Sequence, residues 1–129
     1  MYLPISLAAA AAAAIINLWL SMRIGAVRQA KKISIGDGGD ADLTRRMRAQ
    51  ANFIENTPIV LVLIALVEAA RPGNIYLAVI AGLYALGRVA HGVGMDGGAL
   101  VKGRMVGTLT TMLTLLGLAV WAITIAIDH

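Results

Sequence analysis

The sequence contains no cysteine and few charged residues, and both deficits restrict what the protein can be. Without cysteine, the chain forms no disulfide, has no thiolate nucleophile of its own and offers no cysteine-based metal site. Charged residues make up only 14% of its 129 residues, whereas hydrophobic residues make up 59% and the mean hydropathy is +0.79. This balance is typical of membrane proteins and unlike that of soluble domains.

Metal and nucleic-acid sites also lack their usual residues. The two histidines, His91 and His129, lie far apart, and no metal-ligand spacing such as His-Glu-x-x-His occurs, so we expect no metal. The net charge of +4 and the pI near 10.0 could indicate nucleic acid. The basic residues, however, flank apolar stretches without aromatic interleaving or a nucleic-acid-binding motif. Anionic lipid headgroups are the simpler partner.

Four stretches are suited to cross a membrane as helices, which requires about 20 predominantly apolar residues. They are residues 3–22, a second stretch that is polar at its start and apolar from 57 to 67, residues 75–93, and residues 105–127. Polar or glycine-rich connections separate them at 31–42, 71–74 and 94–103. The sequence therefore predicts an all-α integral membrane bundle of four helices with up-down topology, forming one domain over residues 1–129.

Basic residues are distributed unequally between the two ends of this bundle. Ten of the eleven lie in or beside the first and third connections, which share a side, and only Arg71 lies on the other. Because positive charge favours the cytoplasmic side, we expect both termini to face away from the cytoplasm. The first apolar stretch is too long for a signal-peptide core, so we expect it to be retained as the first helix.

Polar residues gather at the start of the second stretch. Arg48, Asn52 and Glu55 stand at positions i, i+4 and i+7 and therefore share one helical face. An arginine and a carboxylate that face inward at hydrocarbon depth indicate a functional site, because lipid offers such groups no partner.

The other three helices bring polar residues to the same end of the bundle. Arg88 and His91 lie three residues apart on the third helix, Arg104 begins the fourth, and Arg28 lies near the end of the first. This set suits a ligand with several carboxylates and one ammonium group, since arginine binds carboxylates bidentately and a glutamate accepts from ammonium. Glutathione fits this description and brings the thiol that the chain lacks.

The segment from Arg48 to Glu55, Arg-Ala-Gln-Ala-Asn-Phe-Ile-Glu, is followed by Pro58 and resembles the second-helix signature of the MAPEG family. These are the membrane-associated proteins in eicosanoid and glutathione metabolism. Residues 87–91, Gly-Arg-Val-Ala-His, resemble the third-helix motif of the prostaglandin synthase branch, and Arg104 has the spacing of that branch's fourth-helix arginine. The resemblance covers nearly the whole chain. It implies a bacterial inner-membrane homotrimer that binds glutathione between neighbouring protomers near the cytoplasmic side.

The resemblance also implies a role for each polar residue of this group. Glutathione would be held by Arg48, Asn52, Glu55, Arg88 and His91, with Arg28 contributing from the adjacent subunit. Arg104 would stabilise the thiolate as the catalytic residue.

Three positions depart from the prostaglandin synthase branch. Ala51, Met95 and Met105 stand where that branch has an arginine, a tyrosine and a serine. The departures argue against prostaglandin synthesis and leave the lipophilic electrophile open.

The same residues allow structural interpretations. Glu55 could form an ion pair with Arg48 or Arg88, and Arg104 could be a headgroup anchor. Three function classes follow: a glutathione transferase or peroxidase, a non-catalytic family member that binds lipid or a partner protein, and a small four-span exporter. An exporter would carry an acid in its first span, and this chain has none there.

Overall fold

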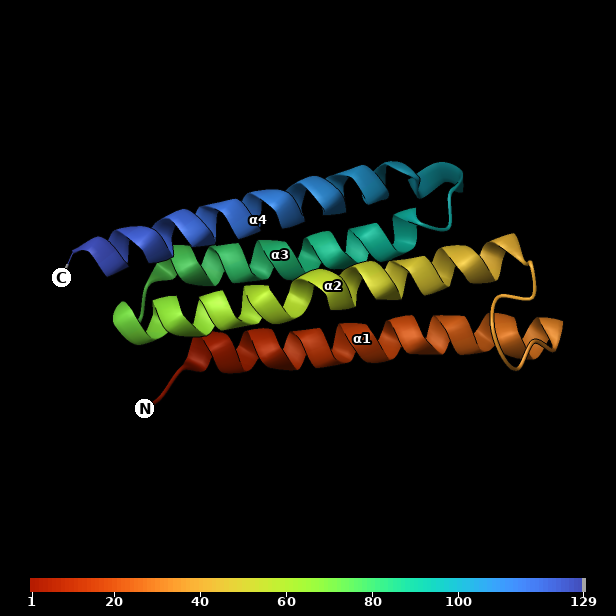
Figure 1. The fold of residues 1–129 in the computed structure, drawn as a ribbon, viewed down its shortest axis with the longest axis horizontal. Coiled ribbons are helices and arrows are strands. Elements are labelled where there is room, and N and C mark those ends of the chain that lie inside the picture. The colour runs from red at the N-terminus through yellow and green to blue at the C-terminus, as the bar shows by residue number, and fades with distance from the viewer. Residues whose placement is uncertain (129) are drawn as a thin grey trace.

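The computed structural model describes residues 1–128, which form four long helices (Figure 1). They are α1 (Pro4–Lys31), α2 (Ala41–Ala70), α3 (Ile75–Gly94) and α4 (Lys102–Ile127), with a short 3-10 turn, η1 (Gly98–Leu100), before α4. Each of the four is long and apolar enough to cross a membrane. The predicted all-α, four-span, multi-pass architecture is therefore confirmed.

Two helices extend well beyond the apolar stretches that predict them. α1 continues past residue 22 to Lys31, and α2 begins at Ala41, long before its apolar part at residue 57. The difference arises because hydropathy marks only the part of a helix inside hydrocarbon, whereas the backbone hydrogen bonds continue into the headgroup region. Pro58 lies inside α2, which continues through it.

The helices run up and down, so the connections alternate between the two ends of the bundle. The α1–α2 and α3–α4 connections lie at one end, and both termini lie at the other, with the α2–α3 turn (Figure 1). We call the first of these the basic end, because it contains residues 23–48 and 88–104, which include ten of the eleven lysines and arginines. The most extensive packing is that of α3 on α4 and of α1 on α2.

Polar side chains cap the first turns of α2 and α3. Asp40 accepts a hydrogen bond from the Leu43 amide at 2.8 Å, and Asn74 accepts from two amides of the first turn of α3. Such caps satisfy amide groups that have no partner inside the helix. The hydrogen bond from Lys31, together with that from the Leu43 amide, lowers the pKa of Asp40 and keeps this cap ionised.

The first turn of α1 has no cap of its own and uses a carboxylate of α2 instead. Pro4 occupies the start of the helix, and Leu3 offers no side-chain acceptor. Glu68 is completely buried and accepts hydrogen bonds from the amides of Ile5 and Ser6 and from the Ser6 hydroxyl, each at 2.8 Å. An anionic oxygen here satisfies free amides at the positive end of the helix dipole. Glu68 therefore joins the start of α1 to the end of α2.

Glycines bring α3 and α4 into close contact at the basic end. Gly103 and Gly107 lie one turn apart on α4, and a Cβ atom on either would collide with α3, at Gly107 with the Cα and Cβ of His91. On α3, Gly94 lies directly against the backbone of Arg104. Small residues at this spacing let helices approach closely in lipid, where packing rather than exclusion of water holds helices together. The approach fixes His91 and the start of α4 relative to each other.

Candidate functional site

Arg88 forms the centre of a polar cluster inside the helix bundle. Its side chain donates from Nη1 to Thr111 Oγ1 at 2.9 Å and from Nη2 to Asn52 Oδ1 at 2.8 Å, and its guanidinium carbon lies 5.8 Å from the centroid of the Phe53 ring. The residue is only 1% exposed. Arg88 therefore links α2, α3 and α4 through one side chain, and within residues 1–128 it forms no ion pair.

Two buried nitrogen atoms of this cluster have no hydrogen-bond partner within the described part of the chain. They are Arg88 Nε and His91 Nδ1, and His91 is 3% exposed. Buried polar groups are almost always satisfied, so unpartnered ones beside a charged side chain are typical of functional sites.

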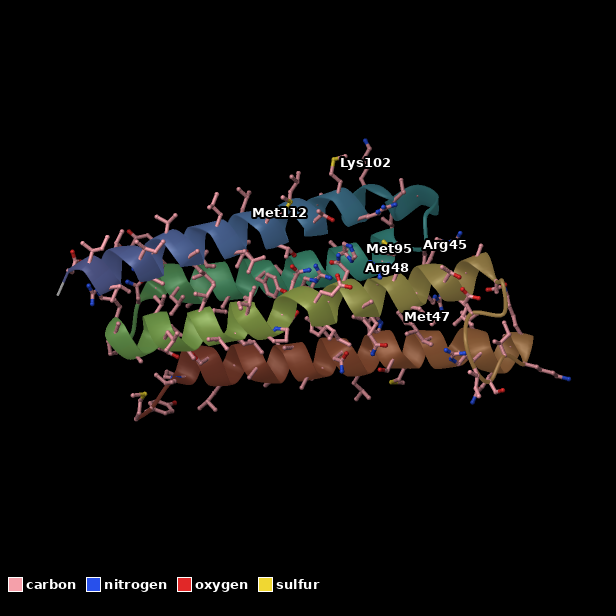
Figure 2. All side chains as sticks on the ribbon, in the orientation of Figure 1. Arg45, Met47, Arg48, Met95, Lys102 and Met112 are labelled. Carbon is pink, nitrogen blue, oxygen red and sulfur yellow. The ribbon has the colours of Figure 1, made fainter. Side chains whose placement is uncertain are left out.

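Arg48 and Glu55 lie on the outer surface of α2 rather than inside the helix bundle. Their side chains are 58% and 59% exposed, and Arg48 Nη1 lies 3.8 Å from Glu55 Oε1. Glu55 comes fourteen residues after the start of α2 at Ala41, about 21 Å along the helix axis. The pair therefore lies where the polar part of α2 meets its apolar part, which begins at residue 57, and its charged groups are open to a polar partner outside the bundle. Arg48 lies on the half of α2 nearer the basic end (Figure 2).

The predicted face of α2 is thus divided between two environments. Asn52 is half-buried and turns toward Arg88, whereas Arg48 and Glu55 face outward. The structure brings Asn52, Arg88 and His91 into the interior and leaves the ion pair at the surface.

Arg28 is engaged with the α1–α2 connection. Its Nη1 donates to the carbonyls of Ile33 and Gly36 at 3.3 and 2.8 Å, and its Nη2 lies 3.8 Å from the sulfur of Met47. These contacts stabilise the connection, and Arg28 does not join the cluster around Arg88.

Arg104 lies in the first turn of α4, where the contact with Gly94 fixes its backbone. Arg104 is exposed, and its guanidinium forms no ion pair or hydrogen bond within residues 1–128. The five donors of this side chain are therefore available to a ligand.

A second polar network, which the sequence did not predict, lies at the basic end. Asp96 in the α3–α4 connection forms ion pairs with Arg23 of α1 and with Arg46 of α2, the latter at 3.3 Å. Arg46 also donates to the Arg23 carbonyl at 2.8 Å, and Arg23 stacks over the Trp19 ring at 4.8 Å. The network anchors the connection that leads into Arg104 to both α1 and α2.

A comparison with known families identifies the whole bundle. Residues 6–124 match the MAPEG family, a match that begins in α1 and ends in α4. The chain belongs to the MAPEG family. A comparison with curated proteins gives no match. The MAPEG family includes glutathione transferases and related enzymes, and the two segments that resemble its motifs lie on α2 and α3, joined by the Asn52–Arg88 hydrogen bond.

Proposed function

We propose that this MAPEG chain binds glutathione between the protomers of a homotrimer and acts as a glutathione transferase or peroxidase on lipophilic electrophiles. The observation that carries the proposal is the Arg48–Glu55 pair, which is exposed on the surface of α2 just before the apolar part of the helix begins at residue 57. An exposed carboxylate and guanidinium at this position need a polar partner outside the protomer.

The surface of α2 beyond this pair supports self-association. After Glu55, exposed apolar side chains follow at helical spacing, at Ile59, Val62 and Leu66. Lipid could cover the apolar part of this stripe but not the charged part, whereas a neighbouring protomer covers both. A homotrimer is the assembly that the resemblance to the MAPEG family implies.

Glutathione matches the side chains that this surface offers. Arg48 would donate to a carboxylate, and Glu55 would accept from the ammonium group. Asn52 Oδ1 accepts a hydrogen bond from Arg88, which leaves the amide nitrogen of Asn52 as a donor for a ligand. Arg88 positions Asn52 through its hydrogen bond, the buried Arg88 and His91 would form the inner wall of the site, and Arg28 would contribute from an adjacent protomer.

The membrane setting fits substrates that dissolve in the bilayer. We propose the bacterial inner membrane, with the basic end in the cytoplasm and both termini on the opposite side, because positive charge favours the cytoplasmic side. Lipophilic electrophiles would reach the site laterally from the bilayer.

Glutathione affinity is expected to depend on the ion pair of α2. Glu55→Gln and Arg48→Ala should each weaken binding about tenfold or more, because truncating one partner of a desolvated charged contact leaves the other unpaired. Isothermal calorimetry on the detergent-solubilised protein measures the effect. Asp42→Asn, which changes an exposed carboxylate at the start of the same helix, is the matched control. Unchanged affinity in both variants would reduce the pair to a structural role.

Thiol activation is expected to depend on Arg104. The glutathione thiol supplies the nucleophile, but with a pKa of about 8.5 only a few per cent is ionised at neutral pH. A guanidinium beside the sulfur would lower that pKa by about 1 to 3 units. Arg104→Leu should therefore abolish the ultraviolet thiolate difference absorbance while affinity changes only a few fold, and Lys102→Leu, two residues away, should retain it.

The same spectrum separates the enzyme from a non-catalytic family member. Met95 and Met105 cannot donate a hydrogen bond to sulfur, so Arg104 is the donor on which activation would depend. Binding of glutathione by the unmodified protein without any thiolate signal would favour the non-catalytic member, which binds lipid or a partner protein.

A further inference from the structure

A long apolar groove follows the seam between α3 and α4 and is separate from the candidate glutathione site. Its main part has a volume of about 510 Å³ and lies mostly between Leu83, Leu86 and Ala90 of α3 and Val106, Thr110 and Leu113 of α4. None of the seven predicted site residues lines it.

The groove continues to the basic end of the bundle. A second hollow of about 330 Å³ is lined by Ala90, Val93, Lys102 and Gly103, among others. Ala90 lines both hollows, and Gly103 precedes Val106 by three residues on the same face of α4. The two hollows are therefore successive parts of one seam. From Gly103 to Gly117 this seam follows α4 for about 21 Å.

The walls of the seam accept hydrocarbon and offer little to a polar ligand. The Thr110 and Thr114 hydroxyls donate to the carbonyls one turn earlier in their own helix, both at 2.7 Å. These hydrogen bonds satisfy the hydroxyls internally, as is common for threonine inside a helix. The remaining lining is aliphatic or glycine.

One end of the seam carries an unpaired positive charge. Lys102 is exposed, forms no ion pair within residues 1–128 and extends outward from the start of α4 (Figure 2). A lysine at the end of a membrane-spanning helix reaches the headgroup plane, where it attracts anionic lipid by about 1 kcal/mol.

We propose that the α3–α4 seam is a binding site for one anionic phospholipid of the leaflet at the basic end. An acyl chain occupies the apolar groove, and the phosphate of the headgroup pairs with Lys102. The length of the seam fits this ligand, because half of a hydrocarbon core of about 30 Å is about 15 Å, which the 21 Å of lining on α4 covers.

The test measures lipid immobilisation in nanodiscs that contain the full-length protein. The probes are phosphatidylglycerol and phosphatidylcholine, each spin-labelled on an acyl chain, in a phosphatidylcholine bilayer. The unmodified protein should immobilise phosphatidylglycerol with about fivefold higher relative affinity than phosphatidylcholine, the ratio expected from one lysine at the headgroup plane.

Two substitutions separate the headgroup contact from the acyl-chain contact. Lys102→Gln should remove the preference for phosphatidylglycerol, whereas Lys32→Gln, at an exposed lysine of the same end outside the seam, should leave it unchanged. Val106→Trp enlarges a side chain that lines the groove close to its headgroup end and should lower immobilisation of both lipids. Val120→Trp is its matched control, because Val120 is an equally exposed valine of α4 that does not line the groove.

Three results would overturn the proposal. They are equal affinity for the two lipids in the unmodified protein, retention of the preference in Lys102→Gln, and unchanged immobilisation in Val106→Trp. If Val106→Trp instead dissociated an oligomer on size-exclusion chromatography, a second copy of the chain and not lipid would cover the seam.

Discussion

Replacing Arg88 with alanine is expected to lower the stability of the folded protein more than any other single change at the candidate site. The substitution leaves Asn52 Oδ1 and Thr111 Oγ1 without their partner and opens a cavity between three helices. An unsatisfied buried polar group costs about 1 to 3 kcal/mol, and large-to-alanine changes in a core cost about 2 to 5, so we expect a loss of about 3 to 5 kcal/mol. Reversible unfolding in mixed detergent micelles, followed by circular dichroism, measures it.

A surface arginine provides the comparison for this experiment. Arg45 forms an ion pair with Asp42 at the exposed start of α2, and exposed pairs contribute about 0 to 1 kcal/mol. Arg45→Ala should therefore unfold almost like the unmodified protein. If Arg88→Ala and Arg45→Ala unfolded at the same denaturant concentration, Arg88 would not be the link between α2, α3 and α4 that its contacts indicate.

Replacing Gly107 with alanine is expected to separate α3 from α4 and to impair catalysis as well as stability. The added Cβ would collide with His91 and with the Gly87 carbonyl, both of which belong to helix α3. Overpacking of this kind costs about 1 to 3 kcal/mol, and here only movement of a whole helix relieves it. Because Arg104 lies one turn earlier on α4, the same movement displaces the proposed thiolate donor.

Gly117→Ala on the same helix is the matched control. The Cβ atom at this glycine meets no neighbouring atom within 4 Å, so the substitution adds no steric conflict and should be neutral or slightly stabilising. The thermal unfolding temperature and the thiolate difference spectrum should both change in Gly107→Ala. In Gly117→Ala the spectrum should stay the same, and the unfolding temperature should not fall. Equal behaviour of the two variants would show that α3 and α4 tolerate a wider separation.

The sequence predicted the number and order of the helices because hydropathy responds directly to the thickness of the bilayer. It also placed the α2–α3 turn correctly, since Arg71, Pro72, Gly73 and Asn74 fall between Ala70 and Ile75, where the helices end and begin. The rotation of each helix about its own axis was harder to predict. In lipid both the inward and outward faces are apolar, so hydropathy does not distinguish them.

The residues of α2 illustrate this limit. With about 100° between successive residues, Asn52 lies about 40° to one side of Arg48 and Glu55 about 20° to the other. The spacing alone places all three on one face, but this separation of about 60° suffices to turn Asn52 toward Arg88 and to leave Glu55 outside. Only the positions of the neighbouring helices decide where that face divides.

Contacts between segments far apart in the chain also could not be predicted from the sequence. Glu68 could be noticed as a carboxylate near the end of an apolar run, but nothing adjacent to it indicates that Ile5 and Ser6 are its partners. Likewise, Asp96 reads as a turn residue beside two glycines, and its pairing with Arg23 and Arg46 depends on how α1, α2 and the α3–α4 connection meet.

The carboxylate of Glu68 has a consequence for the order in which the membrane protein is made. α1 is synthesised before α2, yet the amides of its opening turn find their acceptor only when the end of α2 has been made and packs beside them. Unsatisfied amides are costly in hydrocarbon, so α1 alone is an incomplete insertion unit. α1 and α2 therefore form a hairpin whose open end, opposite the α1–α2 connection, is joined by a single side chain.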